Sequence, residues 1–247
     1  MSGPDLISRQ PVWADVQLEA REALTAIEAL LTAGTEHAAR APNERVYVAS
    51  QLLRASSDHA RAIALVLSTE PMDFGAVALS LHRSQLEQFC RGMFFGRAAT
   101  DAEVDYYLQH DDLPSRPDAD GKKRRVTLKE MAAWAEANLG LSPQNPGTVG
   151  ALAQAIQTAW DPLCGMVHGG HALLASYRGQ DEGIGATVPI PTLLQVLANA
   201  VSITAHALGG YLLIAVPDEL DRLFRPASEL ANAYAAARKQ RWAALAL

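Results

Sequence analysis

The chain has 247 residues, a formal net charge of -6 and a hydrophobic fraction of 49%, with only 6% aromatic residues. A chain of this length can bury a sizeable core without a metal or a disulfide. The acidic balance argues against a surface built wholly for nucleic acid. Alanine is abundant and runs of β-branched residues are scarce, so the composition predicts an all-α protein.

Several protein classes are excluded by what the sequence lacks. The N-terminal segment has no basic start followed by an apolar run, as a secretory signal would have. The most apolar segment, residues 193–216, is interrupted by polar residues such as Gln195 and His206, unlike a membrane span. Cys90 and Cys164 have no zinc-type spacing. We therefore expect a cytoplasmic protein with buried free thiols, no membrane association, no cofactor and no metal.

The first half of the chain predicts three long helices. Apolar residues at helical spacing indicate the first helix over about residues 12–33. Asn43 can cap a second helix over about residues 44–68. Asp73 can cap a third helix, which continues to about Gly96.

Two capping boxes mark the starts of the next helices, because each pairs a threonine with a glutamate three residues later. Thr100 with Glu103 opens a short fourth helix, and Thr127 with Glu130 opens a helix that runs to about residue 139. Between them, residues 110–126 contain prolines, a glycine and dense charge, which predict a charged loop or insertion.

The remaining chain predicts further helices separated by turns. One should cover about residues 148–167, disturbed at Pro162. Glycines and prolines then predict an extended loop or short hairpin near residues 172–190. A long apolar helix follows over about residues 192–215. Pro217 opens a short helix.

Pro226 is expected to open the last helix, which runs to about residue 245. With no internal repeat and no long linker, residues 1–247 predict a single helical domain, a bundle of about seven to nine helices. The last helix carries Leu230, Tyr234 and Ala237 at helical spacing. This face can pack against another copy of the chain, so we expect a homodimer.

Polar residues stand among the apolar faces of the third predicted helix. Arg83, Glu87 and Arg91 are spaced by four, which places them on one stripe beside an apolar arc. A partly buried charge is costly unless it is paired, and a glutamate between two arginines meets that need. Two interpretations stay open: a ladder of ion pairs that stabilises the helix, or a site lined by Arg83 and Glu87 with Arg91 beside them.

His168 stands at the end of an apolar helix, just before two glycines, and His171 follows. A helix C-terminus favours a protonated imidazole, and glycine favours the C-cap conformation, so His168 can be explained as a cap. The same position also suits a general acid or base. Without a carboxylate or thiol partner, the two histidines do not predict a metal site.

The R-x3-E-x3-R of residues 83–91 and the V-H-G-G of residues 167–170 resemble an uncharacterised bacterial all-helical family that is similar to HEPN-like helical domains. The resemblance covers about residues 45–210. It implies a helical bundle, dimerisation, and a role in RNA cleavage or phage defence. It also implies functional positions at Arg83, Glu87, His168, Gly169 and Gly170, with His59 facing them.

Arg54 and His59 have the R-x4-H spacing of the HEPN ribonucleases, in which an arginine and a histidine cooperate in cleavage of the RNA backbone. Residues five apart on a helix point about 140° away from each other. We therefore expect Arg54 to face solvent and His59 to face the bundle. No arginine stands four to six residues before His168, so the nuclease pair cannot be assigned there either.

These observations leave two functions open. The first is a non-catalytic helical module that dimerises and binds a small ligand or an RNA or protein partner, in a stress or phage-defence setting. The alternative is a metal-independent ribonuclease or toxin, with His168 or His59 as acid or base. In it, Arg83 steadies the scissile phosphate, which a planar guanidinium matches. The acidic charge favours the first. His59, Arg91 and His171 are candidate ligand-binding residues in either case.

Overall fold

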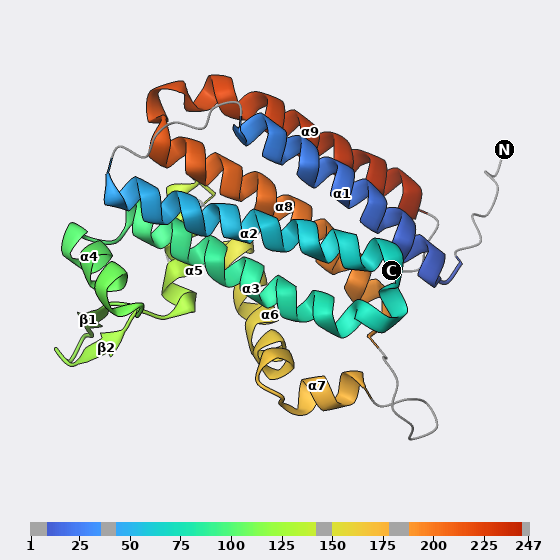
Figure 1. Cartoon of the computed structure of the whole chain (residues 1–247), viewed down its shortest axis with the longest axis horizontal. Helices are drawn as coiled ribbons and strands as arrows, with labels where there is room; N and C mark the ends of the chain where they lie inside the picture. Colours follow the sequence, from blue (N-terminus) through green and yellow to red (C-terminus); the bar gives the residue numbers. More distant parts are fainter. Residues whose placement is uncertain (1–8, 36–42, 142–149, 178–187, 244–247) are drawn as a thin grey trace.

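The computed structural model describes residues 9–35, 43–141, 150–177 and 188–243. Its frame is a bundle of five long helices, each of 23 to 27 residues. These are α1 (Trp13–Thr35), α2 (Glu44–Thr69), α3 (Pro71–Arg97), α8 (Ile190–Ala215) and α9 (Leu220–Trp242). Figure 1 shows them alongside one another, with α1 and α9 on one side of the bundle and α3 on the other.

Shorter elements complete the described fold. They are α4 (Asp101–His110), β1 (Ser115–Pro117), β2 (Lys123–Arg125), α5 (Leu128–Asn138), α6 (Ala151–Val167), α7 (His171–Ser176) and the 3-10 turn η1 (Pro217–Glu219). Both α5 and α6 contact α3, and α7 contacts α6. With nine α-helices and one small sheet in the described residues, the predicted all-α bundle is confirmed.

The central helix of the bundle is α8, which contacts α1, α2, α3 and α9. Leu193, Leu197 and Ala200 of this helix are fully buried. Within the described ranges, α8 is the one helix that is long and apolar enough to cross a membrane, and 61% of its most apolar stretch is buried inside the protein. A helix that is apolar nearly all round is typical of a core helix as well as of a membrane span. Burial among four helices accounts for the composition of α8.

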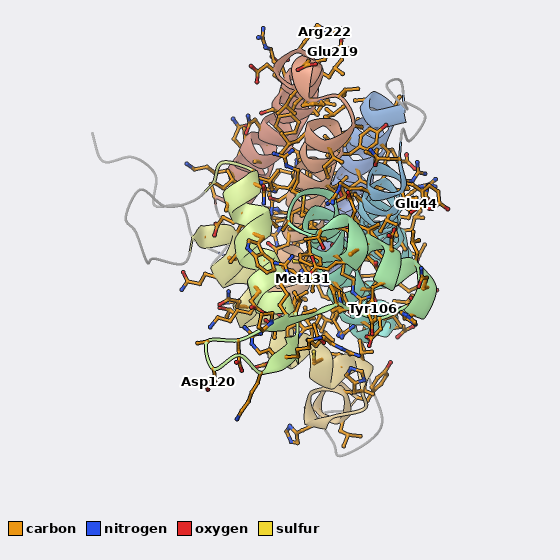
Figure 2. All side chains as sticks on the ribbon, turned by 90° about the vertical axis from the view of Figure 1, so that its left-hand side faces the viewer. Glu44, Tyr106, Asp120, Met131, Glu219 and Arg222 are labelled. Carbon is orange, nitrogen blue, oxygen red and sulfur yellow. The ribbon has the colours of Figure 1, made fainter. Side chains whose placement is uncertain are left out.

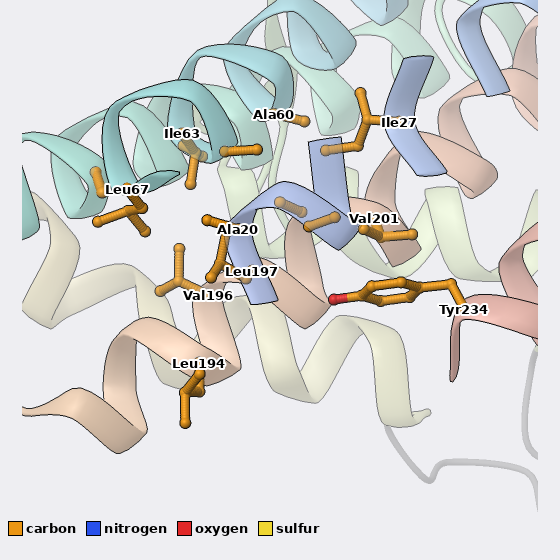
Figure 3. Packing of buried hydrophobic residues seen from close by; sticks show 14 of the residues in the cluster. Ala20, Ile27, Ala60, Ile63, Leu67, Leu194, Val196, Leu197, Val201 and Tyr234 are labelled. Atoms are coloured by element: carbon orange, nitrogen blue, oxygen red, sulfur yellow. The ribbon is translucent and has the colours of Figure 1, made fainter. Parts of the chain in front are cut away.

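Aliphatic side chains fill the space between α1, α2 and α8 (Figure 3). Ile27 of α1 and Ile63 and Leu67 of α2 are fully buried. Burial of such a side chain contributes about 1.5–3 kcal/mol relative to its exposure. Ala20 and Ala60 are also fully buried, and their small side chains let α1 and α2 approach closely. The abundant alanine of the sequence therefore serves close helix packing.

A buried carboxylate joins the first and last helices. Glu19 of α1 is fully buried. Its carboxylate accepts hydrogen bonds from three side chains of α9: the Tyr234 hydroxyl, Trp242 Nε1 at 2.6 Å and Arg241 at 3.1 Å. Arg238 lies 3.6 Å away. A buried charge is tolerated only when it is paired and hydrogen-bonded, and α9 supplies both.

Tyr234 therefore faces the core of its own chain, as Figure 3 shows. Its burial and the neighbouring Glu19 raise the pKa of Tyr234, so the hydroxyl stays protonated and donates. The expectation that Tyr234 faces a second copy, together with Leu230 and Ala237, is wrong for this residue. Leu230 is exposed and Ala237 is half-buried.

The expected helix starts are mostly confirmed. Asn43 caps α2 by accepting a hydrogen bond from the Val46 amide at 3.0 Å. Thr100 and Thr127 each form a complete capping box, at the starts of α4 and α5. The third helix instead begins at Pro71, two residues before Asp73. The fixed φ of proline suits the first turn of a helix, where its missing N–H costs nothing.

Two helices, α6 and α9, contain a proline in their interior. The expectation that Pro226 opens the last helix is wrong, because α9 begins at Leu220 and continues through it. A proline removes one backbone hydrogen bond of a helix. Leu223 and Ala227, on either side of Pro226, are buried and hold this turn of α9 against the bundle. Pro162 likewise lies inside α6.

Residues 110–126, predicted as a charged loop, contain an antiparallel hairpin in which Arg116 of β1 is opposite Arg124 of β2. Gly121 has a φ of +77° at the turn, a conformation that favours glycine. In Figure 2, Asp120 marks the outer tip of the hairpin.

Arg116 of β1 connects this hairpin to the helices of the bundle. Its guanidinium donates to Glu103 at 2.7 Å and to the Ala98 carbonyl at 2.8 Å. It also lies over the rings of Phe94 and Trp134, at 5.2 Å and 4.9 Å from their centroids. A cation held over aromatic rings in this way adds about 0.5–2 kcal/mol. The partners of Arg116 come from α3, α4 and α5, so the local charge pattern could not reveal them.

The hairpin expected near residues 172–190 is not found where the structure describes that segment. Residues 171–176 form α7, and Tyr177 is its C-cap. Residues 178–187 of the expected loop lie outside the described residues.

The Glu19 cluster predicts a large loss of stability when its carboxylate is removed. We expect Glu19→Ala to lower the free energy of unfolding by about 3–5 kcal/mol, because two arginines lose their buried partner. Urea denaturation followed by circular dichroism measures this change. Glu22→Ala, at an exposed glutamate of the same helix, is the matched control and should change stability by less than about 0.5 kcal/mol. Equal losses in the two variants would contradict the role of Glu19.

Glu130 predicts a pH-dependent contribution to stability. Hydrogen bonding to Arg124 is the main cause that lowers the pKa of Glu130 from 4.5 to about 2. A carboxyl group whose pKa is lowered on folding stabilises the protein above about pH 4.5, and the effect is lost as the pH falls toward 2. We expect Glu130→Gln to lower the melting temperature at pH 7. In melts between pH 5 and pH 2, the difference from the wild type should vanish; a constant difference would count against this ion pair.

Candidate functional site

The predicted polar stripe is present on α3. Arg83 Nη1 donates to Glu87 Oε2 at 2.6 Å, and Arg91 Nη2 donates to Glu87 Oε1 at 2.6 Å. The three side chains are 15%, 18% and 24% exposed, in the order Arg83, Glu87 and Arg91. Both oxygens of the carboxylate are therefore occupied by arginines, in a setting that is largely shielded from water.

Trp160 of α6 extends this cluster to a second helix. The guanidinium carbon of Arg83 lies 4.5 Å from the centroid of the Trp160 ring. Such a contact favours a cation over the face of the ring. Arg83 Nε and Arg91 Nε are buried and have no hydrogen-bond partner in the described residues. The cluster thus ties α3 to α6 and keeps two N–H donors that are not used within the described chain.

His168 and His171 lie apart from this cluster. Both are exposed, at the junction of α6 and α7. His168 is the C-cap of α6, and Gly169 after it has a φ of +69°, as a C-cap glycine should. Eight residues separate Trp160 from His168, which is about 12 Å along a helix axis. Among the described residues, neither imidazole forms a hydrogen bond or ion pair with the Arg83 cluster.

His59 also remains separate. Arg54 is exposed and pairs with Asp58 on its own helix, as expected for a residue that faces solvent. His59 is half-buried, and its Nδ1 lies 2.7 Å from the Ala55 carbonyl oxygen one turn earlier on α2. Because a carbonyl can only accept, Nδ1 carries the proton. The Arg54 and His59 side chains are thus engaged locally, in different directions.

A buried histidine beside Arg83 was not among the predicted site residues. His82 is only 2% exposed, and its Nδ1 lies 2.9 Å from Gln85 Oε1. Gln85 Nε2 in turn donates to the Ala200 carbonyl of α8 at 3.1 Å. The Gln85 oxygen is therefore the acceptor, so His82 Nδ1 carries the proton and Nε2 is left as an acceptor. Burial lowers the pKa of His82, which favours the neutral ring.

One signal in the sequence could have found His82. It stands four residues before Leu86 and seven before Phe89, both buried, so it shares their face of α3. Arg83, one residue later, is rotated by about 100° toward the edge of that face.

His82 lines an open cavity of about 390 Å³ between α3, α6, α8 and the C-terminal end of α5. The polar side chains on its wall are His82, Glu136, Asn199, Ser202 and His206. Apolar side chains such as Leu86, Ile156 and Ile203 form much of the rest. A neighbouring cavity of about 660 Å³ shares His82 and Asn199 with the first. Together with the Arg83 cluster, this cavity is the candidate functional site.

Glu136 is the only formally charged group on the described wall of the smaller cavity. It is buried, and its Oε1 accepts a hydrogen bond from the Leu152 amide at 2.9 Å, at the start of α6. The first turn of a helix has free N–H groups and favours a negative charge. Glu136 therefore stabilises the start of α6 while it also borders the cavity.

Comparison with known proteins gives one family. Residues 53–237 match a family model described as a family of unknown function (DUF6988). No match is found among curated proteins or among solved structures. The matched segment includes the Arg83 cluster, the residues that line the cavity, and both exposed histidines of the α6–α7 junction. Since the match covers more than half of the sequence, the chain belongs to this family of unknown function, DUF6988.

Proposed function

We propose that the chain is a non-catalytic helical binding module, in which the Arg83–Glu87–Arg91 cluster is an internal strut that holds α6 on α3 beside a ligand cavity. The observation that carries this proposal is the engagement of Glu87. Both of its oxygens accept from arginines at 2.6 Å, and Arg83 is also stacked on Trp160. An arginine held in this way has its charge compensated within the chain, so it is poorly placed to recruit a phosphate.

The alternative, a HEPN-like metal-independent ribonuclease or toxin, has one observation in its favour. Arg83 Nε and Arg91 Nε are buried donors without a partner in the described chain, and a phosphate could accept from them. The proposed acid or base, His168, is exposed about 12 Å farther along α6. A general acid must come within hydrogen-bond reach of the reacting group. The binding module therefore has the stronger support.

We also propose that the module forms a homodimer, with a second copy covering the α6–α7 segment. Leu174 is 67% exposed, and Val167 and Tyr177 nearby in the chain are also exposed. Exposed apolar side chains gathered on one segment are typical of an interaction surface. The cytoplasmic location, an RNA or protein partner and the stress or phage-defence setting belong to the same proposal.

The homodimer can be tested by one substitution. We expect light scattering after size-exclusion chromatography to give twice the mass of the chain for the wild type and the mass of one chain for Leu174→Glu. A charge on the proposed interface would have to be buried without a partner, which opposes association. Leu230→Glu, at an exposed leucine of α9, is the matched control and should leave the mass unchanged. A monomeric wild type would overturn the proposal.

The binding module and the ribonuclease differ in what Arg83→Ala and His168→Ala change. Removing Arg83 breaks an ion pair and a cation–π contact, so we expect a loss of about 1–2 kcal/mol, or about 2–8 °C in melting temperature. His168→Ala should leave the melting temperature nearly unchanged, because the ring is exposed. Arg54→Ala, at an exposed ion pair of α2, is the control and should cost less than about 1 kcal/mol.

The same variants are incubated with total RNA, and the products are separated by gel electrophoresis. We expect no cleavage by the wild type beyond a buffer control. Cleavage that is lost in His168→Ala and in Arg83→Ala, without a change in melting temperature, would replace the strut with an active site.

A further inference from the structure

Two neutral imidazoles lie on the wall of the smaller cavity. His82 Nδ1 donates to Gln85, so the Nε2 atom of the ring is left as a hydrogen-bond acceptor. His206 of α8 lies with Nδ1 at 2.7 Å from the Ser202 carbonyl oxygen, so this nitrogen also carries the proton and Nε2 is again the acceptor. Burial lowers the pKa of both histidines. At neutral pH the two rings therefore accept hydrogen bonds and do not repel a cation.

A carboxylate shares this wall. Glu136 uses Oε1 to cap α6, and its Oε2 has no hydrogen-bond partner in the described part of the chain. The partial positive charge of a helix N-terminus is about half a unit, so it compensates the carboxylate only in part. No arginine or lysine is found among the described residues that line the cavity. The site thus combines one negative charge with uncharged acceptors, an arrangement that favours a cationic donor and opposes an anion.

The cavity has the size and composition of a small-molecule site. Its volume of about 390 Å³ falls within the range of about 300–1,000 Å³ that is usual for such sites. Leu86, Ile156 and Ile203 supply apolar walls, and Asn199 and Ser202 add polar groups that can orient a ligand. In the described residues, no group of three or more histidine, cysteine or acidic side chains is arranged to hold a metal ion.

We propose that this cavity binds a small organic amine, with its ammonium group at Glu136 and its apolar body against Leu86 and Ile156. The neutral rings of His82 and His206 lie on the same wall and add no positive charge to it. The proposal rests on the proposed function of a binding module and names the class of its ligand. An ammonium group offers three donors and one positive charge, and the cavity wall offers acceptors and one negative charge. A hydrocarbon body gains by leaving water for the apolar walls.

The test compares three sets of probes that share one apolar body. The amines are benzylamine, 2-phenylethylamine and 4-phenylbutylamine, and each is paired with the alcohol and the carboxylate of the same chain length. Melting temperature and isothermal titration calorimetry are measured with the full chain at pH 7. We expect at least one amine to raise the melting temperature and to bind at least tenfold more tightly than its alcohol. We expect the carboxylates to produce no shift.

Two variants locate the binding. Glu136→Gln keeps an acceptor for the Leu152 amide but removes the charge, so it should weaken amine binding at least tenfold and leave alcohol binding unchanged. Ala155→Leu places a larger side chain on the cavity wall from an exposed position of α6 and should weaken both. Ala236→Leu, at an exposed position of α9 away from the cavity, is the matched control and should bind like the wild type.

The possible outcomes distinguish a wrong ligand class from a wrong proposed function. Alcohols that bind as tightly as amines, or amine binding that survives Glu136→Gln, would overturn the amine assignment and leave a binding module. Binding that survives Ala155→Leu would remove this cavity as the site. If none of the probes binds and the chain cleaves RNA, the binding module itself falls.

Discussion

The burial of α8 among four other helices is the constraint on which the rest of the fold depends. Its backbone is approached closely from two sides, because a Cβ at Gly210 would collide with the sulfur of Met93 on α3 and a Cβ at Gly209 would lie 3.0 Å from the Phe224 ring of α9. A helix packed in this way carries its polar side chains where a neighbour leaves space or where it meets solvent. Ser202, for example, is exposed. Asn199, Ser202 and His206 follow one another by three and four residues, so they share one face.

That face of α8 borders the cavity. Asn199, Ser202 and His206, three of the polar residues that interrupt this apolar segment, line the space between α8, α3 and α6. Gln85 belongs to this arrangement as well, because it connects the Ala200 carbonyl of α8 to His82 of α3. The cavity is thus a consequence of the way in which the most apolar helix accommodates its few polar groups.

Local signals in the sequence were sufficient for most of the long helices and for two capping boxes. The capping boxes at Thr100 and Thr127 depend on residues three positions apart, so the chain shows them directly. The β1–β2 hairpin was not predicted, because the contacts that hold it are not local in the sequence. Arg116 of β1 contacts Glu103, Phe94 and Trp134, which come from three separate helices. The start of the last helix was wrongly predicted at Pro226 for a similar reason. Packing of α9 against the bundle outweighs the local preference of proline to begin a helix.

The candidate site was predictable only in part, for the same physical reason. The ion pairs of Arg83, Glu87 and Arg91 follow from a spacing of four on one helix, so the sequence indicated them. Contacts between segments far apart in the chain leave no pattern in the local sequence from which they could be predicted. Glu19 finds its partners more than 200 residues later in α9, and Trp160 meets Arg83 across two helices. The placement of His168 away from Arg83 likewise depends on the direction in which α6 runs.

The Arg83–Glu87–Arg91 cluster and the cavity both involve α6. His82 and Arg83 are consecutive residues of α3, about 100° apart on the helix, and both reach α6. Arg83 lies over Trp160, while His82 shares the cavity wall with Ala155, Ile156 and Ala159. Glu87 pairs with Arg83, whose guanidinium contacts Trp160 of α6. Adjacent residues of α3 thus face two different surroundings, an ion-paired cluster at Arg83 and a cavity wall at His82.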